Sequence, residues 1–90
     1  MQKRVNVIIK GRVQGVGYRY FVKQKAGDLE LNGWVRNLKN GHVEAMFEGD
    51  PSRVQEMLKA CREGPRPARV DEIEVKENQL DGELNRFEII

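Results

Sequence analysis

The sequence predicts an α+β domain in which two helices cover one face of an antiparallel sheet. Short runs of alternating apolar residues predict strands, and they occur near both ends of the chain and in its middle. Two longer segments with apolar residues three and four positions apart predict helices between these strands. A chain of 90 residues with 39% hydrophobic residues can form one apolar core. We therefore expect residues 1–90 to fold as a single domain.

The first two elements are a strand and a helix. Val5, Val7 and Ile9 alternate with polar residues, which predicts a strand over residues 3–10. Three apolar residues at i, i+4 and i+7 then predict a helix over residues 19–31, with one face turned to the core.

A β-hairpin is expected next, over residues 34–47. Segments rich in β-branched and aromatic residues flank the pair Asn40-Gly41, which suits a two-residue type I′ turn. Two more strands are expected at residues 70–75 and 86–90, where apolar and charged residues again alternate.

The second helix is the most clearly marked element. Asp50 is suited to its N-cap, Pro51 to its first turn and Gly64 to its end. Four apolar residues with helical spacing are expected to face the core: Val54, Met57, Leu58 and Cys61. The resulting order, β-α-β-β-α-β, is that of the ferredoxin-like sandwich. This fold carries enzymes, RNA-binding domains and regulatory modules, so it does not decide function.

Composition restricts the classes of protein to which the chain can belong. One cysteine excludes an internal disulfide, and one cysteine with one histidine excludes a structural zinc site. The apolar segment near the N-terminus is too short for a signal peptide, and no run is long enough to span a membrane. We therefore expect a cytoplasmic monomer with no membrane partner.

Charge is unevenly distributed along the chain. Residues 1–27 contain seven Lys or Arg and no Asp or Glu, whereas residues 28–90 contain nine Lys or Arg and fourteen Asp or Glu. Such polarity is typical of a protein that meets an anionic partner with its N-terminal third. It is equally compatible with a surface on which the charges mix after folding.

A glycine-rich, basic loop, GRVQGVGYR, occupies residues 11–19 between the first strand and the first helix. Gly11, Gly15 and Gly17 permit positive φ angles or the close approach of a ligand. Successive N–H groups in such a loop can form an anion-binding nest, to which the following helix N-terminus adds partial positive charge. Arg19 can present two N–H groups to one phosphate. A tight turn with incidental arginines is the alternative reading.

This loop resembles the signature of the acylphosphatase family, Gly-x-Val-Gln-Gly-Val-x-Phe-Arg. A second family segment, Gly-Trp-Val-x-Asn, matches GWVRN at residues 33–37, and the separation of Arg19 from Asn37 also fits. The resemblance continues through the NGHVEAMFEG hairpin and the GPRPARV connection, so it covers essentially the whole chain. One departure is Tyr18, where the family usually has phenylalanine.

The resemblance implies hydrolysis of acyl phosphates to a carboxylate and inorganic phosphate, with no metal and no cofactor. It implies that Arg19 binds the phosphate and that Asn37 holds the attacking water. The backbone amides that it assigns to the phosphate are those of Gln14, Gly15, Val16, Gly17 and Tyr18. Inorganic phosphate and sulfate are expected to compete for the same loop.

The rest of the sequence offers little other phosphatase machinery. Cys61 lies on the apolar face of the second expected helix and outside any CxxxxxR loop, so we expect it in the core. His42 follows a turn and Ser52 lies in a first helical turn, where both residue types are ordinary. An arginine, amide donors and Asn37 suffice for an acyl phosphate, because its carboxylate leaving group is weakly basic and positioning supplies most of the catalysis.

Two non-enzymatic functions are compatible with the same elements. A non-catalytic anion-binding or regulatory module could use this loop on this fold. An RNA-binding domain shares the strand and helix order, but the expected strand HVEAMFEG lacks the paired aromatic residues of an RNP1 segment and carries two glutamates. We therefore expect a small acyl phosphate as the partner, and no nucleic acid.

Overall fold

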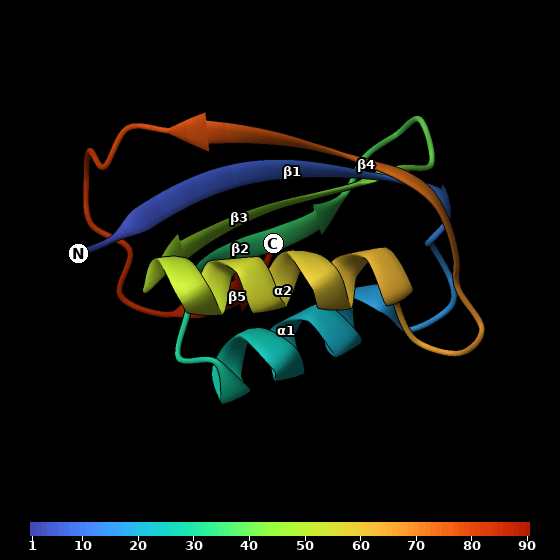
Figure 1. Cartoon of the computed structure of the whole chain (residues 1–90). Helices are drawn as coiled ribbons and strands as arrows, with labels where there is room; N and C mark the ends of the chain where they lie inside the picture. Colours follow the sequence, from blue (N-terminus) through green and yellow to red (C-terminus); the bar gives the residue numbers. More distant parts are fainter.

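Five strands and two helices make up the computed structural model, which describes residues 1–90. The elements are β1 (Lys3–Arg12), α1 (Tyr18–Asp28), β2 (Asn32–Asn37), β3 (Val43–Gly49), α2 (Pro51–Glu63), β4 (Arg69–Asn78) and β5 (Phe87–Ile89). The strands form one sheet in the order β4-β1-β3-β2-β5, and both helices cover the same face of it (Figure 1). The ferredoxin-like α+β prediction is confirmed.

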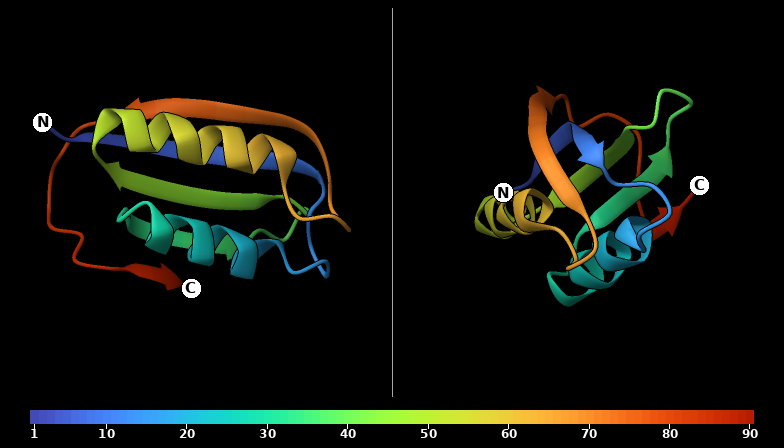
Figure 2. Two further views of the ribbon diagram at one scale, coloured as in Figure 1. Left: turned by 60° about the horizontal axis from the view of Figure 1, so that its bottom comes forward. Right: turned by 90° about the vertical axis from the view of Figure 1, so that its right-hand side faces the viewer.

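One edge of the sheet differs from the expected antiparallel pattern. β4, β1, β3 and β2 pair antiparallel, but β5 pairs parallel to β2, with Gly33 opposite Phe87. The reason lies in the connection: after β4 the chain turns back and passes around one end of the sheet (Figure 2). β5 therefore runs opposite to β4, which is the direction of β2. The sheet is mixed, and the expectation of a purely antiparallel one is wrong at this edge.

The hydrophobic core lies between the sheet and the helices and contains 17 buried residues. The predicted inward faces of the first strand and the second helix are confirmed. They consist of Val5, Val7 and Ile9 on β1, and of Val54, Met57, Leu58 and Cys61 on α2. Asp50 caps α2 as expected, because its carboxylate accepts a hydrogen bond from the Ser52 backbone N–H at 2.9 Å.

α1 ends earlier than the apolar spacing suggested. Its last residue is Asp28, and Glu30 follows with a left-handed φ of 56°. The backbone N–H of Glu30 donates to Gly27 O at 3.1 Å, and that of Leu31 donates to Ala26 O at 2.9 Å. These two bonds form a Schellman motif, which satisfies the last carbonyls of the helix. The helix therefore stops before residue 31, and Leu31 is buried just beyond it.

The β2–β3 hairpin has a longer turn than expected. The backbone N–H of Leu38 donates to His42 O at 2.8 Å, which leaves three residues, 39–41, in the loop. A second bond joins the Gly41 N–H to Leu38 O at 3.2 Å, and Gly41 has a φ of 93°. Asn40 does not have a positive φ, which a type I′ turn centred on Asn40-Gly41 requires. Its side chain instead accepts a hydrogen bond from the His42 backbone N–H at 3.0 Å. The type I′ prediction is wrong.

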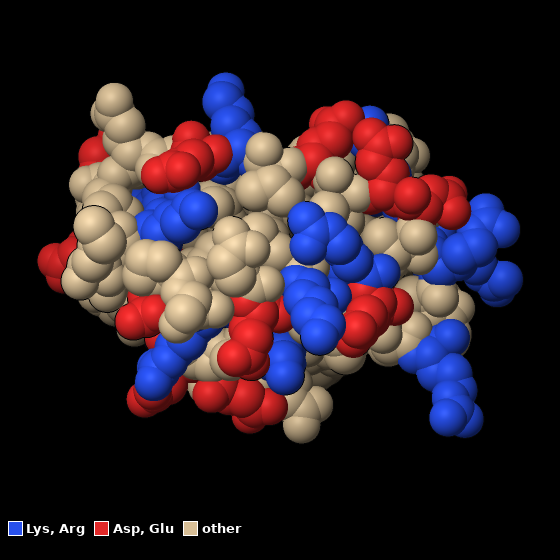
Figure 3. Space-filling model, in the orientation of Figure 1, with Lys and Arg blue, Asp and Glu red and all other residues tan.

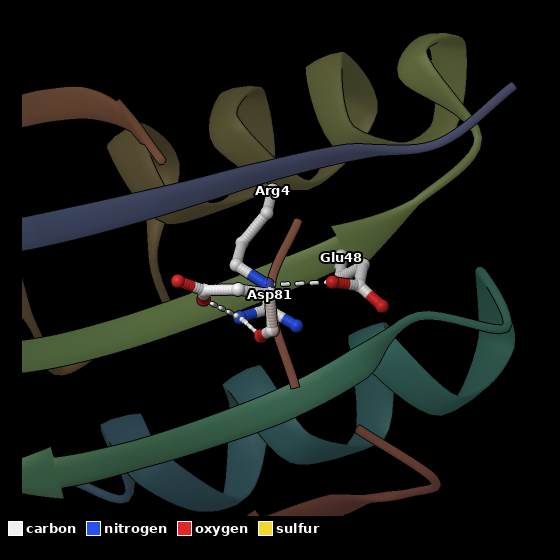
Figure 4. Close-up of polar contacts among 3 residues, drawn as sticks. All are labelled: Arg4, Glu48 and Asp81. Carbon is white, nitrogen blue, oxygen red and sulfur yellow. Dashed lines mark hydrogen bonds and ion pairs between the residues drawn. The ribbon is translucent and has the colours of Figure 1, made fainter. Parts of the chain in front are cut away.

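Arg4 forms hydrogen bonds that link the segment between β4 and β5 to the sheet. It lies on β1 and is only 7% exposed. Its Nε donates to Glu48 Oε1 at 2.6 Å, and its Nη1 donates to the backbone oxygen of Asp81, also at 2.6 Å (Figure 4). A guanidinium this buried needs such partners, because a buried charge without a counter-charge is strongly destabilising. The contact holds the segment between β4 and β5 in place before it reaches the far edge of the sheet.

The charge asymmetry of the sequence is partly neutralised by folding. Arg4 pairs with Glu48, and Lys10 pairs with Glu74 at 2.7 Å. Basic and acidic side chains are interspersed over the face of the molecule that Figure 3 shows. Arg19, by contrast, forms no ion pair. No helix combines the length and the apolar character that crossing a membrane requires.

Tyr18 links the two helices through the core. Its side chain is 1% exposed, and its hydroxyl donates to the backbone oxygen of Cys61 at 2.7 Å. Cys61 lies in the last turn of α2, where carbonyls have no partner within the helix. Burial, and then the contact with Cys61, raise the pKa of Tyr18, so the hydroxyl stays protonated and remains a donor. The hydroxyl therefore supplies a donor to the end of α2.

Tyr18→Phe is expected to lower the free energy of unfolding by about 1–2 kcal/mol, because the buried Cys61 carbonyl loses its donor. The measurement is urea unfolding followed by circular dichroism. Tyr20→Phe is the matched control, since Tyr20 is 77% exposed and its hydroxyl makes no hydrogen bond, so its stability should match that of the parent. Equal stability of all three proteins would show that the Tyr18 hydroxyl contributes nothing.

Candidate active site

The loop between β1 and α1 contains two glycines in the left-handed conformation, which anion-binding nests use. Gly15 and Gly17 have φ angles of 72° and 78°, which residues with a Cβ rarely adopt. Gly17 is the N-cap of α1 and offers no side-chain cap to the first turn of that helix. A Cβ added at either glycine would meet no atom within 4 Å, so the backbone angle, not crowding, calls for glycine here.

The amide groups of this loop are free. No hydrogen bond within the protein uses the backbone N–H of any residue from 14 to 18 as a donor. The first bond of α1 comes later, from the Phe21 N–H to Gly17 O at 3.1 Å. Backbone donors without a protein partner are stabilised by an external acceptor, and at a helix N-terminus an anion is favoured. The loop thus presents unused donors where a phosphate could accept them.

A small cavity of about 230 Å³ opens beside these donors. Gly15 and Gly17 line it from the loop, Tyr18 and Arg19 from the start of α1, and Asn37 from the end of β2. The structure therefore brings together five of the seven residues that the sequence assigned to the site. No carboxylate lines the cavity, so nothing in its wall repels an anion.

The other two assigned residues have side chains that do not line this cavity. Val16 is half-buried and packs against the hydrophobic core. The side-chain amide of Gln14 donates to Leu38 O at 2.7 Å and to His42 O at 2.9 Å, both on the β2–β3 hairpin. The sequence reasoning assigned Gln14 a backbone role only and missed this link. A long amide side chain between the glycines of a loop was its one signal in the sequence.

Arg19 is the charged group of the cavity. It is the second residue of α1 and is half-buried, and its side chain forms neither an ion pair nor a hydrogen bond with another residue. Its guanidinium therefore keeps all five of its donors for a ligand. The positive end of the α1 dipole lies next to it and favours the same kind of ligand.

Asn37 is the last residue of β2 and pairs with Val43 across the hairpin. Its side-chain amide makes no hydrogen bond in the protein, and the side chain that bonds within the neighbouring turn is that of Asn40. Asn37 thus has an unused donor and an unused acceptor in the wall of the cavity.

A larger cavity of about 610 Å³ adjoins the small one. The two share Arg19 and Tyr20 in their walls, so they lie side by side. The remaining wall of the larger cavity mixes charged and apolar residues: Lys23, Arg86, Phe87, Glu88 and Ile89.

Other nucleophiles lie away from these cavities. Cys61 is fully buried, as expected, and burial raises the pKa of its thiol to about 12. A thiol held protonated in this way is a poor nucleophile. The Ser52 hydroxyl donates to the Asp50 carboxylate at 2.6 Å. This bond, together with the bond from the Ser52 backbone N–H, lowers the pKa of Asp50. No group of three or more His, Cys, Asp or Glu side chains is placed to hold a metal ion.

Comparisons with known proteins agree on one family. The family model described as Acylphosphatase matches residues 5–89. The acylphosphatase of Syntrophobacter fumaroxidans is 48% identical over 88 residues, which cover 98% of this chain and 91% of that protein. The acylphosphatase of Methylococcus capsulatus is also 48% identical over 88 residues, covering 98% of this chain and 96% of that protein.

Solved structures show the same likeness. The crystal structure of acylphosphatase from Bacillus subtilis matches with a TM-score of 0.95 and 38% identity, covering 100% of this chain and 99% of that one. The structure of an acylphosphatase from Coxiella burnetii matches with a TM-score of 0.93 and 31% identity, covering 99% and 93%. Full-length HypF, in its phosphate- and nucleotide-bound form, matches with a TM-score of 0.88 and 28% identity over only 12% of its chain.

Proposed function

The chain belongs to the acylphosphatase family, and from that premise we propose how its own residues hydrolyse acyl phosphates. The reaction cleaves the mixed anhydride of a carboxylic acid and phosphate. The phosphoryl group lies in the 230 Å³ cavity and accepts hydrogen bonds from the free backbone N–H groups of residues 14–18. Arg19 neutralises its charge through two parallel N–H donors. The observation that carries this proposal is the set of unused amide donors beside an arginine that has no counter-ion.

Asn37 is the second catalytic residue of the proposal. Its free side-chain amide holds a water on the side of the phosphoryl group opposite the acyl oxygen. From there the water oxygen attacks phosphorus in line with the bond that breaks. The support for this role is that Asn37 lines the cavity while its amide makes no bond to the protein.

The bond changes need no further side chain. The bond from the water oxygen to phosphorus forms as the bond from phosphorus to the acyl oxygen breaks, and the carboxylate leaves with that electron pair. One proton of the water passes to a phosphoryl oxygen of the substrate, so the products are a carboxylate and dihydrogen phosphate. Because a carboxylate is a weakly basic leaving group, no general acid has to protonate it. Arg19 and the backbone N–H groups of residues 14–18, which we call the phosphate cradle, supply the catalysis through positioning and charge stabilisation.

The acyl group extends in the proposal from the cradle past Tyr20 into the larger cavity. One hydrophobic core of 17 buried residues supports the proposal that residues 1–90 act as one domain, and we propose that the enzyme is a monomer. A single unpaired cysteine fits a reducing, cytoplasmic setting. The enzyme acts without a metal or cofactor, and inorganic phosphate and sulfate compete with the substrate for the cradle.

A steady-state assay with benzoyl phosphate in EDTA tests this function. We expect full turnover in EDTA. The rate on p-nitrophenyl phosphate should be lower by several orders of magnitude, because p-nitrophenolate is a much more basic leaving group than a carboxylate. Phosphate and sulfate should inhibit competitively. Loss of activity in EDTA that added Mg²⁺ or Zn²⁺ restores would contradict the proposal, as would equal rates on the two substrates. Binding of phosphate without any turnover would favour a non-catalytic module.

A further inference from the structure

We infer that Gln14 is a positioning residue, whose side chain fixes the place of Asn37 relative to the phosphate cradle. This inference rests on the proposed function. Gln14 Nε2 carries two protons, and it donates one to Leu38 O at 2.7 Å and the other to His42 O at 2.9 Å. Both donors of the amide are therefore used on the hairpin, and neither is left for a ligand.

The link joins the chain segments that carry the two halves of the site. Gln14 directly precedes Gly15 in the cradle, and Leu38 directly follows Asn37 at the end of β2. Leu38 and His42 also pair with each other, through the Leu38 N–H and His42 O at 2.8 Å. The Gln14 side chain thus donates hydrogen bonds to the residue pair that closes the hairpin. This pair begins one residue after Asn37, the residue proposed to hold the water.

The sheet itself does not hold these two ends together. In the strand order β4-β1-β3-β2-β5, β3 separates β1 from β2, so no ladder bond joins them. Two strand spacings amount to about 10 Å, a gap that only a long side chain spans. Besides Gln14, no residue of the loop 13–17 makes a side-chain hydrogen bond to the hairpin.

The hairpin does not depend on Gln14 for its own closure. The bonds from Gly41 N–H to Leu38 O and from His42 N–H to the Asn40 side chain already close the turn. What Gln14 adds is the placement of the hairpin end against the cradle. Displacement of a reacting group by about 1 Å can cost on the order of 100-fold in rate, so such a link acts on the chemical step.

The test is a double-mutant cycle between Gln14 and Asn37. Gln14→Met keeps the length of the side chain but removes both donors, and we expect it to lower kcat on benzoyl phosphate by about 10- to 100-fold. The inhibition constant of inorganic phosphate should change by less than about threefold, because the cradle amides and Arg19 remain. In the Asn37→Ala background the same substitution should change kcat by less than about threefold, because its effect passes through Asn37.

Asn6→Leu is the matched control. Asn6 on β1 donates its side-chain amide to Glu44 on β3 at 3.1 Å, so its replacement also removes an amide link to the hairpin. That link lies on the sheet face opposite the core, away from the cradle, and kcat should stay within about twofold of the parent. If Gln14→Met does not fold, Gln14→Asn enters the same cycle, since it keeps the amide but is too short to reach both carbonyls.

The outcomes separate this inference from the proposed function. Equal losses of kcat for Gln14→Met with and without Asn37 would overturn the inference, because Gln14 would then act independently of Asn37. Full turnover of Asn37→Ala would remove the water-holding role itself, and the inference with it. A loss that appears only as weaker phosphate inhibition would mean that the Gln14 side chain serves phosphate binding, and would also contradict the positioning role.

Discussion

Arg19→Ala is expected to lower kcat/KM on benzoyl phosphate by about 1,000-fold or more, which corresponds to about 4 kcal/mol of transition-state stabilisation. The inhibition constant of inorganic phosphate should rise in parallel. Both effects have one cause: Arg19 is the charged residue that has no counter-ion and lines the cradle, so its guanidinium meets phosphoryl oxygens in the substrate and in the transition state. Steady-state kinetics with phosphate as inhibitor measure both.

Two matched variants sharpen this result. Lys25→Ala removes a positive charge from the same helix, but Lys25 lines neither cavity, so its kinetics should stay close to those of the parent. Arg19→Lys keeps the charge but loses the planar pair of donors, and its activity should fall between those of the parent and Arg19→Ala. If Lys25→Ala loses as much activity as Arg19→Ala, then the overall field and not a specific contact binds the phosphate.

Asn37→Ala is expected to lower kcat by about 100- to 1,000-fold, the scale found when one well-placed donor is removed from an active site. In contrast to Arg19→Ala, the inhibition constant of phosphate should barely change, because Asn37 contacts the water and not the bound anion. Rapid-quench or steady-state measurements of kcat, together with phosphate inhibition, separate the two effects.

Asn40→Ala is the control for Asn37, since it removes another asparagine of the same hairpin. The Asn40 side chain accepts a bond from the His42 N–H and does not line the cavity, so its loss should affect stability and leave kcat within a few-fold. Circular dichroism must show that both variants are folded. A folded Asn37→Ala enzyme that loses phosphate affinity as badly as Arg19→Ala would contradict the water-holding role.

Local signals in the sequence predict much of this fold. α2 is predicted from its N-cap to its end because Asp50, Pro51 and Gly64 act within one turn of their own positions. β1 is predicted because the alternation of its residues is a property of the strand itself. The order of the elements then follows, and with it the fold class.

The predictions that were wrong concern how the strands and helices are connected and paired with one another. The parallel direction of β5 is set by the path of the connection after β4, on which the local pattern of residues 86–90 has no bearing. The turn at residues 39–41 depends on which residues of β2 and β3 pair, so Asn40-Gly41 alone could not identify it. α1 ends where Glu30 adopts a left-handed conformation, which apolar spacing does not report.

The candidate site likewise has features that the sequence predicts and features that depend on contacts between distant segments. Arg19, Gly15, Gly17 and Asn37 were predicted to act together, and they meet at one cavity because β1, α1 and β2 converge at one end of the sheet. Gly11 lies within β1, opposite Val70, and does not line the cavity. The uses of the Gln14 and Tyr18 side chains could not be predicted. Their acceptors lie 24 to 43 residues away in the chain and are backbone carbonyls, which carry no signal in the sequence.

The central claim is that water attacks phosphorus while the phosphoryl group is held in the cradle. A single turnover of benzoyl phosphate in H₂¹⁸O, with enzyme in excess and the products examined by mass spectrometry, tests it most directly. Attack at phosphorus predicts one ¹⁸O atom in the inorganic phosphate and none in the benzoate. Label in the benzoate would mean that water attacks the carbonyl carbon, and would contradict the proposed roles of the cradle and of Asn37.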